Sequence, residues 1–333
     1  MTVKTFCDIV WDLSPSEVSL LIKKTDYNEF TIPKKSGVRI INFLPHTSSL
    51  FTCQKALIRY LNRQDFPDCV KGFIKRENYL TYLEPHVGAE FFLRVDIKDF
   101  FSSITEDTIK NELECLMSFD SEEDKKEILD LISSIVTYKG VVPQGAPCSP
   151  IISNVVMIRI DQRITKYCQS LGIYYTRYAD DMLFSSSQFD FLNRKWFIKK
   201  IKYILLSQNL RLNYSKTKYA KDEISLNGYV VSKNGIRLSR ERLYDIRSIV
   251  AFSKTHSYLA KSNPELFLTE VNLLQLKHRD LKNYPFKKMY QYLQFLCGYR
   301  AYLISFTEYD IDPKFAKKIN KLVQIIEEQL RKY

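Results

Sequence analysis

The chain has 333 residues, of which 45% are apolar and 14% aromatic, with only 9 glycines and 11 prolines. This composition excludes a collagen-like, low-complexity or disordered chain, and the length predicts two or three subdomains. The seven cysteines are scattered without a Cys-x-x-Cys pair, which argues against a disulfide framework or a zinc site. No apolar run approaches the roughly 18 residues of a membrane span, so we expect a soluble, cytoplasmic protein without a membrane partner.

The net charge of +12 is concentrated toward the C-terminus. Residues 237–333 contain 18 Lys and Arg against 10 Asp and Glu, whereas residues 1–236 contain 32 against 28. Because the positive charge is concentrated in the last third of the chain while the rest is nearly neutral, the sequence favours a polyanionic partner. The alternative is a basic surface that only aids solubility.

The first part of the chain predicts a helix, a hairpin and a buried strand in succession. A Ser-Pro-Ser-Glu sequence at residues 14–17 supplies a cap, a proline for the first helical position and a capping-box carboxylate. Two extended runs around a Lys-Lys-Ser-Gly turn predict a β-hairpin with a basic tip over residues 30–41. Residues 91–95 are mostly aromatic and apolar, which predicts a buried strand that leads directly into Asp96.

The middle of the chain mixes helical and extended patterns. Residues 105–136 and 151–171 have helical periodicity, and a second cap signal lies at Ser121. Residues 173–178 and 182–186 are rich in β-formers around a tight Ala-Asp-Asp centre, which predicts a second hairpin.

The last part of the chain adds one more extended run and then a helical region. Residues 226–231 predict a strand, and beyond Ile236 almost every segment predicts helix. The sequence therefore predicts an α+β protein with a helical, basic C-terminal domain.

Two of the predicted strands lead directly into carboxylates. Asp96 follows the strand at residues 91–95, and Asp180 and Asp181 lie at the centre of the second hairpin. Carboxylate oxygens suit Mg²⁺, which keeps several waters and binds substrate phosphates. Two such ions would clamp the attacking hydroxyl and the leaving pyrophosphate of an in-line phosphoryl transfer. An Asp-Asp turn alone is also typical of a solvated hairpin tip.

Five ordered motifs extend this argument. Tyr-Ala-Asp-Asp occupies residues 178–181, and Asp96 precedes a Phe-Phe-Ser-Ser-Ile sequence. Val-Pro-Gln-Gly-Ala-Pro-Cys-Ser-Pro lies at residues 142–150, Leu-Asn-Tyr-Ser-Lys-Thr at 212–217 and Leu-Asn-Gly-Tyr at 226–229. In order and spacing, these segments resemble the catalytic, nucleotide-contacting, palm and primer-grip motifs of reverse transcriptases, specifically the bacterial retron-type group.

The resemblance implies a right-hand polymerase fold with an antiparallel palm sheet. Residues 1–95 would form an N-terminal helix and the fingers, 96–236 the palm with interleaved fingers helices, and 237–333 a helical, nucleic-acid-binding thumb. It implies RNA-directed DNA polymerase activity with two Mg²⁺ ions, dNTPs, an RNA template and a DNA product.

The resemblance also assigns roles to single residues. Asp96, Asp180 and Asp181 would be the catalytic, metal-binding carboxylates, with the backbone of Ile97 as a further metal ligand. The residues expected at the incoming nucleotide are Arg39, Phe100, Phe101, Gln144, Gly145 and Lys216.

Several of these assignments have alternatives. Phe101 would exclude a ribose 2′-hydroxyl, unless it is a core aromatic. Lys34 and Lys35 would neutralise the triphosphate from the hairpin tip, unless they form a solvated turn, so Arg39 is preferred. Lys216 would protonate the pyrophosphate as a general acid or serve a structural or phosphate-neutralising role.

The last helix is predicted without the resemblance. Asp312 and Pro313 form a helix start. An apolar face follows at helical spacing, made of Phe315, Ile319, Leu322 and Ile326. A basic stripe also follows, made of Lys314, Lys317, Lys318 and Lys321. This stripe predicts an RNA-backbone contact, with a solvated lysine face as the alternative.

Residues 82–86 and 226–228 each keep one residue of a retron signature, a His and a Gly respectively. A retron enzyme would copy a cognate structured noncoding RNA, prime from a 2′-hydroxyl, and make a branched RNA–DNA hybrid for antiphage defence with an effector protein. Three alternatives stay open. These are another defence-associated reverse transcriptase with different priming, a diversity-generating or truncated intron-like enzyme, and a non-catalytic RNA-binding scaffold.

Overall fold

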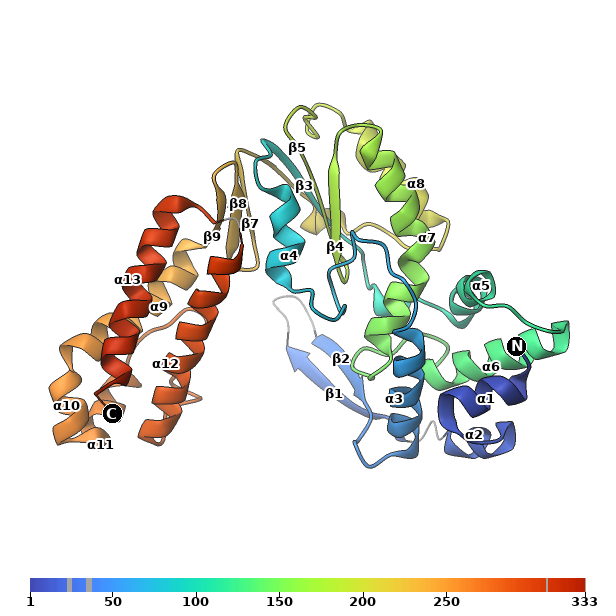
Figure 1. Cartoon of the computed structure of the whole chain (residues 1–333), viewed down its shortest axis with the longest axis horizontal. Coiled ribbons are helices and arrows are strands. Elements are labelled where there is room, and N and C mark those ends of the chain that lie inside the picture. The colour runs from blue at the N-terminus through green and yellow to red at the C-terminus, as the bar shows by residue number, and fades with distance from the viewer. Residues whose placement is uncertain (23–25, 34–37, 310, 333) are drawn as a thin grey trace. The chain divides into compact units, whose positions relative to one another are not determined.

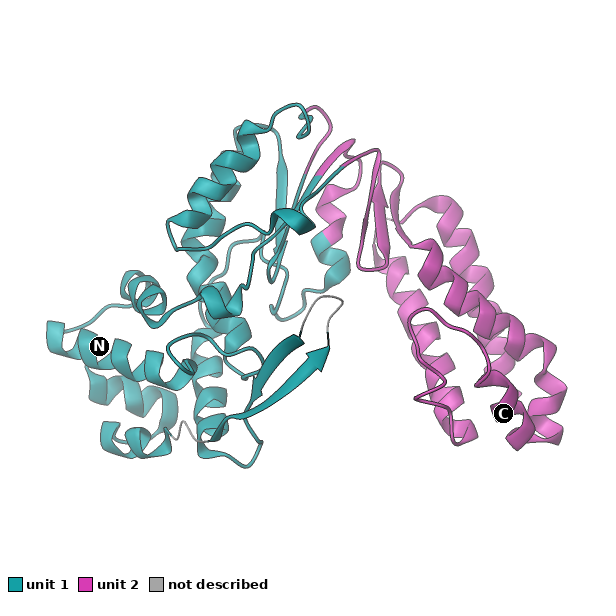
Figure 2. Ribbon diagram, turned by 180° about the vertical axis from the view of Figure 1, so that it is seen from behind, with its two compact units in different colours: residues 1–82, 93–184, 189–219 teal, residues 83–92, 185–188, 220–333 magenta. Residues whose placement is uncertain are grey.

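The computed structural model describes residues 1–22, 26–33, 38–309 and 311–332. They form two compact units, shown in Figure 2. Unit 1 contains Met1–Tyr82, Leu93–Phe184 and Phe189–Tyr219. Unit 2 contains Leu83–Phe92, Ser185–Gln188 and Ala220–Tyr333. The subdomain boundaries expected after residues 95 and 236 stay predictions.

Unit 1 begins with three helices, α1 (Val3–Trp11), α2 (Pro15–Leu21) and α3 (Ser49–Leu61). The start predicted for α2 is confirmed, because Ser14 accepts from the Glu17 amide while the Glu17 carboxylate accepts from the Ser14 amide at 2.8 Å. This reciprocal capping satisfies amides that would otherwise have no partner inside the helix.

The β-hairpin predicted over residues 30–41 is also confirmed. Strands β1 (Asn28–Pro33) and β2 (Val38–Phe43) pair antiparallel, with Ile32 opposite Arg39. The expected basic tip with Lys34 and Lys35 lies outside the described residues.

A four-stranded sheet carries the three predicted catalytic aspartates, in the strand order β4-β5-β3-β6. Its strands are β3 (Phe91–Asp96), β4 (Tyr174–Tyr178), β5 (Asp181–Ser186) and β6 (Lys218–Lys221). All six residues of β5 are buried, so the strand is covered on both faces. The buried strand that leads into Asp96 and the hairpin around the Ala-Asp-Asp turn are thus confirmed.

Helices α7 (Ser149–Gln169) and α8 (Trp196–Leu206) lie beside this sheet (Figure 1). The ring of Phe197 on α8 packs edge-on against Phe184 of β5, and it stacks on Tyr167 of α7. These buried aromatic contacts join the two helices to the sheet that carries the carboxylates.

The helical stretch predicted over residues 105–136 is two helices, α5 (Glu106–Leu116) and α6 (Glu122–Val136). The break between them ends at the predicted cap, where the Ser121 hydroxyl accepts from the Asp124 amide at 3.0 Å. A short helix, α4 (Tyr79–Leu83), precedes β3.

Unit 2 contains an antiparallel sheet of β7 (Glu223–Leu226), β8 (Tyr229–Ser232) and β9 (Gly235–Leu238). The single strand predicted over residues 226–231 is wrong, because a turn at Asn227 and Gly228 separates β7 from β8. Both turn residues have positive φ, +46° and +88°, which is the geometry that an Asn-Gly pair favours in tight hairpins.

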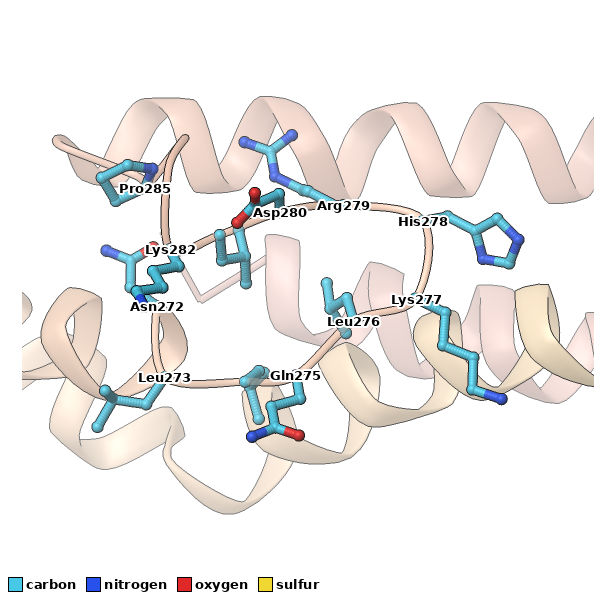
Figure 3. Close-up of a pocket in the computed structure, with 12 residues that line it drawn as sticks. Asn272, Leu273, Gln275, Leu276, Lys277, His278, Arg279, Asp280, Lys282 and Pro285 are labelled. Carbon is cyan, nitrogen blue, oxygen red and sulfur yellow. The ribbon is translucent and has the colours of Figure 1, made fainter. Parts of the chain in front are cut away.

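The rest of unit 2 is mainly helical. Its helices are α9 (Arg240–Thr255), α10 (Ser257–Ser262), α11 (Pro264–Val271), α12 (Met289–Ile304) and α13 (Pro313–Leu330). The prediction of nearly continuous helix beyond Ile236 is wrong for residues 272–288. They form a loop around a cavity of about 870 Å³ (Figure 3). The loop is closed at its base, because Asn272 and Phe286 exchange two hydrogen bonds of 2.8 and 3.0 Å.

Helix α13 has the predicted start and faces. The Asp312 carboxylate accepts from the amides of Lys314 and Phe315, and Pro313 is the first helical residue. The four predicted apolar residues are buried and the four predicted lysines are exposed. Nowhere in the described part of the chain is a helix both long and apolar enough to cross a membrane.

Candidate catalytic site

A buried ion pair supports the turn of the β4–β5 hairpin. Arg177 and Asp161 are fully buried, and the guanidinium donates to both carboxylate oxygens at 2.7 to 3.0 Å. The same guanidinium donates to the Ala179 carbonyl at 3.0 Å. Ala179 has φ +57°, a conformation that residues with a Cβ rarely adopt. The ion pair therefore holds a strained turn directly beside Asp180.

Gly72 lies against the same turn. A Cβ atom at this position would lie 2.5 Å from the Ala179 nitrogen, which is closer than real side chains approach backbone. The Gly72 carbonyl accepts from the Asn154 side chain of α7 at 2.9 Å. The segment that contains Gly72 is thus fixed on one side by α7 while it contacts the turn on the other.

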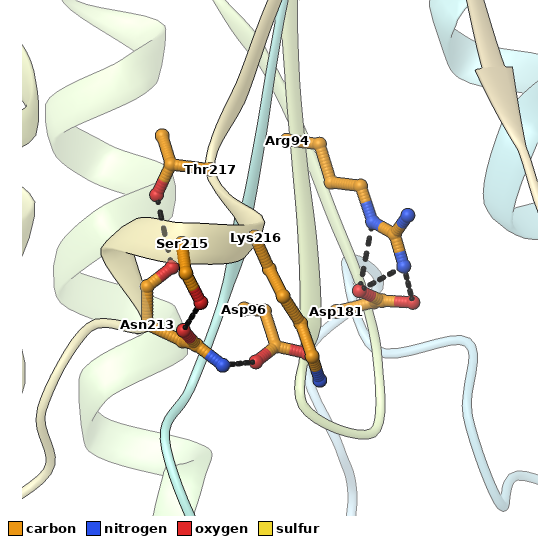
Figure 4. A network of polar contacts seen from close by, with 7 residues as sticks. All are labelled: Arg94, Asp96, Asp181, Asn213, Ser215, Lys216 and Thr217. Atoms are coloured by element: carbon orange, nitrogen blue, oxygen red, sulfur yellow. Dashed lines mark hydrogen bonds and ion pairs between the residues drawn. The ribbon is translucent and has the colours of Figure 1, made fainter. Parts of the chain in front are cut away.

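Asp181 is held by an arginine from the neighbouring strand β3. Arg94 donates to both Asp181 oxygens, with two Nη2 contacts of 2.7 Å and an Nε contact of 2.9 Å (Figure 4). Arg94 and Asp96 are two residues apart on β3, so their side chains lie on the same face. Burial raises the pKa of the Asp181 carboxyl, and the Arg94 guanidinium opposes that rise.

Asp96 is buried and has two side-chain partners from the segment at residues 213–216. Its Oδ1 accepts from the Asn213 amide at 2.9 Å, and its Oδ2 pairs with the Lys216 Nζ at 2.9 Å (Figure 4). The Ser215 hydroxyl donates to the side-chain oxygen Oδ1 of Asn213 at 2.7 Å. This hydrogen bond fixes the orientation of the Asn213 side-chain amide. The palm motif predicted after the hairpin therefore contacts the first catalytic motif directly.

Asp180 completes a group of three carboxylates that share one electrostatic environment. Burial raises the pKa of Asp180, and the charges of Asp96 and Asp181 raise it further. The Ile97 amide donates to the Asp180 carbonyl at 3.1 Å, which links the end of β3 to the turn. Excess negative charge at this place favours bound cations.

The donor chemistry fits Mg²⁺, because the predicted ligands are all oxygens. Among the described residues, however, no group of three or more His, Cys, Asp or Glu side chains is arranged so that it could hold a metal ion. Arg94 and Lys216 instead bring positive charge to Asp181 and Asp96. Two of the three carboxylates among the predicted metal ligands are thus oriented by cationic side chains.

The two phenylalanines after Asp96 differ in their surroundings. Phe100 is 4% exposed and belongs to the core, whereas Phe101 is half-buried at the start of a short 3₁₀ turn. Their ring centroids are 5.5 Å apart. Phe101 therefore has the accessible ring surface that a contact with a nucleotide sugar needs.

The β1–β2 hairpin lies on the Pro-Gln-Gly turn. The Asn42 amide of β2 donates to the Gln144 carbonyl at 2.8 Å. Gly145 has φ +117°, and a Cβ there would lie 2.7 Å from the Ile41 side chain, so only glycine fits. Arg39 is exposed on β2 of the same hairpin. The structure thus joins the hairpin of Arg39 to the predicted nucleotide-contacting residues.

Four residues at this site have no role of their own in the sequence-based prediction: Arg94, Asp161, Arg177 and Asn213. Asn213 lies within the predicted palm motif, and Arg94 and Arg177 also carry a signal in the sequence. Arg94 lies two residues before Asp96 on the predicted strand, so the two side chains are expected on the same face. Arg177 is a charged residue inside a strand that is otherwise aromatic and β-branched, which indicates a buried partner.

The reverse transcriptase (RNA-dependent DNA polymerase) family matches residues 23–231 of this chain. The chain belongs to the reverse transcriptase family. It is 29% identical over 260 residues to the retron Ec86 reverse transcriptase of Escherichia coli, which covers 75% of this chain and 77% of the relative. It is 32% identical over 173 residues to the retron Mx162 reverse transcriptase of Myxococcus xanthus, covering 48% of this chain and 36% of the relative.

These matches identify a bacterial retron-type reverse transcriptase with the right-hand polymerase fold, and its activity is RNA-directed DNA polymerisation. Among solved structures, this reverse transcriptase is similar to a telomerase from Candida albicans solved with a fragment of telomeric RNA. That match has a TM-score of 0.49 at 16% identity, and it covers 92% of this chain and 64% of the telomerase chain.

Proposed function

We propose that this reverse transcriptase copies a cognate structured noncoding RNA into single-stranded DNA as a retron enzyme. Synthesis would start from a 2′-hydroxyl within the RNA, and the branched RNA–DNA product would act in antiphage defence together with an effector protein. The observation that carries the proposal is the three-carboxylate site, with Asp181 held by Arg94 and Asp96 held by Lys216. The names of the relatives support the retron assignment.

The carboxylates at the β3 end and the β4–β5 turn would hold two Mg²⁺ ions. Asp96 and Asp180 would supply carboxylate oxygens to hold them, and the Ile97 backbone would contribute a further oxygen. Bound ions would activate the attacking hydroxyl and stabilise the charge on the departing pyrophosphate. Asp181 would support this arrangement, because Arg94 fixes both of its oxygens.

Other residues would position the incoming nucleotide. Arg39 would neutralise triphosphate charge from the fingers hairpin, while Gln144 and Gly145 would form the surface on which the base pair is placed. Phe101 would lie under the sugar and exclude a 2′-hydroxyl. Lys216 would meet phosphate oxygens of the incoming nucleotide, and its 56% exposed side chain, 2.9 Å from Asp96, supports this role.

The test is to purify the protein with its co-expressed RNA and to sequence the nucleic acid before and after treatment with a 2′–5′ debranching nuclease. The proposal predicts a DNA species whose mobility changes on debranching. Unbranched DNA would indicate a defence-associated enzyme with different priming. RNA without DNA would indicate a scaffold.

The Asp180→Asn variant is the matched control for this experiment. Replacing the carboxylate removes a charge that the bound ions need, so DNA should be absent while the RNA still co-purifies. Primer extension at a near wild-type rate by Asp180→Asn would remove the catalytic assignment.

A further inference from the structure

Helix α8 covers the palm sheet with one face and leaves the other open. Phe197 and Ile201 are buried on the inner face, where Phe197 contacts the ring of Phe184. The outer face carries large side chains that are exposed: Trp196 by 48%, Tyr203 by 66% and Leu206 by 42%. Residues at this three- to four-residue and seven-residue spacing lie on one side of a helix, so they form a single stripe.

Basic residues surround this stripe. Residues 191–211 contain six Lys and Arg and no Asp or Glu. Five of the six belong to α8 or the turn before it: Arg194, Lys195, Lys199, Lys200 and Lys202. Throughout the described residues, none of these five forms a salt bridge. The outer surface of α8 is therefore both aromatic and strongly positive.

The stability of the helix does not explain this pattern. Arg194 and Lys195 precede the N-terminus of α8, where the helix dipole disfavours positive charge, and the first turn contains no acidic residue. Lys195 and Lys199 are four residues apart, a spacing at which like charges destabilise a helix. The charges and exposed rings together point to an anionic partner.

Cations already contact one exposed ring of this surface, Tyr203, and one buried ring that adjoins Trp196, Phe189. The Lys200 ammonium lies 5.6 Å from the centroid of the Tyr203 ring, and the Arg194 guanidinium lies 4.6 Å from that of Phe189. Phe189 contacts Trp196 edge-on. Exposed rings interleaved with cations are the arrangement on which unpaired bases stack while their phosphates are neutralised.

We infer that the outer face of α8 binds an unpaired segment of RNA, with bases on Trp196 and Tyr203 and phosphates on the surrounding lysines. This inference rests on the proposed function, because it supplies a place for noncoding RNA that is not being copied. Trp196 and Tyr203 are seven residues, or about 10 Å, apart along the helix axis, which equals about three stacked base steps.

The test separates α8 from the polymerase site by filling that site first. The enzyme is loaded with a template–primer duplex and then titrated with a fluorescein-labelled 20-nucleotide single-stranded RNA at several salt concentrations. Tyr203→Ala should bind this RNA about tenfold more weakly, since a lost base stack is worth a factor of this order. Lys199→Gln with Lys200→Gln should flatten the slope of log affinity against log salt by about 1.4.

The matched control removes two exposed lysines from other helices of unit 1, Lys4→Gln with Lys126→Gln, and should leave affinity and slope unchanged. Extension of the loaded primer should be normal in every variant. Unchanged RNA binding by both α8 variants would overturn the inference. So would full displacement of the RNA by an equal charge of polyglutamate, which would indicate an acidic protein partner. A lack of branched DNA in the wild type would count against the proposed function but would not alter these affinities.

Discussion

Arg94 and Asp181 form a two-oxygen ion pair between neighbouring strands of the palm sheet. The Arg94 side chain is 21% exposed and that of Asp181 11%, so water screens the pair only partly. A carboxylate in this position would otherwise be buried beside two others. Arg94 therefore favours the charged form of Asp181 and fixes its orientation before any substrate arrives.

We expect Arg94→Met to destabilise the protein and to reduce DNA synthesis. Removing one partner of a largely buried pair leaves the other charge uncompensated, at a cost of about 3 kcal/mol in the free energy of unfolding. Urea denaturation and primer extension measure the two effects. Arg94→Lys should fall between the wild type and the methionine variant, because an ammonium keeps the charge but not the two-oxygen geometry. Wild-type stability in Arg94→Met would contradict the role assigned to this pair.

We expect Phe101→Ala to accept ribonucleotides better relative to deoxyribonucleotides. Its half-buried ring is inferred to fill the space that a 2′-hydroxyl needs, so the discrimination is steric. The measurement is the ratio of kcat/KM for dNTP and rNTP. Phe92→Ala is the matched control, because that ring is 1% exposed on β3 and its loss should cost about 3–5 kcal/mol of stability without changing the ratio. An unchanged ratio with lowered stability in Phe101→Ala would make Phe101 a core residue as well.

We expect acidification to destabilise the protein through His86. The ring is fully buried, with Nδ1 2.7 Å from the Ser185 hydroxyl, and burial lowers its pKa to about 3. Between pH 6.5 and 3 the unfolded chain binds a proton that the folded chain excludes, so stability is present above pH 6.5 and falls as the pH is lowered. The loss is about 1.4 kcal/mol for each pH unit in this window.

The measurement is the free energy of unfolding at pH 7 and pH 5 for the wild type and for His86→Gln. The glutamine variant should start less stable and lose about 2 kcal/mol less over this interval. If both proteins lost the same free energy of unfolding between pH 7 and pH 5, His86 would bind its proton in the folded state as readily as in the unfolded state.

We expect the basic stripe of α13 to contact RNA. The stripe lies in the first half of the helix, where the dipole disfavours positive charge, while the acidic pair Glu327 and Glu328 lies near the end. Replacing all four lysines with Gln should weaken binding of the co-purified RNA and flatten its salt slope by up to about 3 units, with the fold intact. An unchanged slope would mean that these lysines only face solvent.

The sequence was sufficient wherever one local signal determined the structure. A run of aromatic and apolar residues predicted the strand into Asp96, and β-forming residues on both sides of a tight turn predicted the hairpin around Asp180. Capping residues predicted the starts of α2, α6 and α13. The turn at Asn227 and Gly228 has an equally local signal, the Asn-Gly pair, which the single strand predicted over residues 226–231 does not take into account.

The contacts that complete the site depend on tertiary structure instead. The pairing of Arg94 with Asp181 joins residues 87 positions apart, and that of Lys216 with Asp96 joins residues 120 apart. No periodicity in one segment specifies which carboxylate a distant cation will meet. Alternation does place Arg94 on the same face as Asp96, but the choice of Asp181 as partner follows from the order of strands in the sheet.

Gly72 sets a limit on how this enzyme can be engineered. The Lys71 amide donates to the Arg177 carbonyl at 2.8 Å, and the Asn154 side chain donates to the Gly72 carbonyl. These two hydrogen bonds prevent the backbone at Lys71 and Gly72 from moving away from the turn. An added methyl group would therefore displace the Ala179 backbone and carry the adjacent Asp180 with it. In a library of variants selected for faster DNA synthesis or for synthesis at higher temperature, only glycine should therefore be recovered at residue 72. This constraint acts on Asp180, which lies more than a hundred positions away in the sequence.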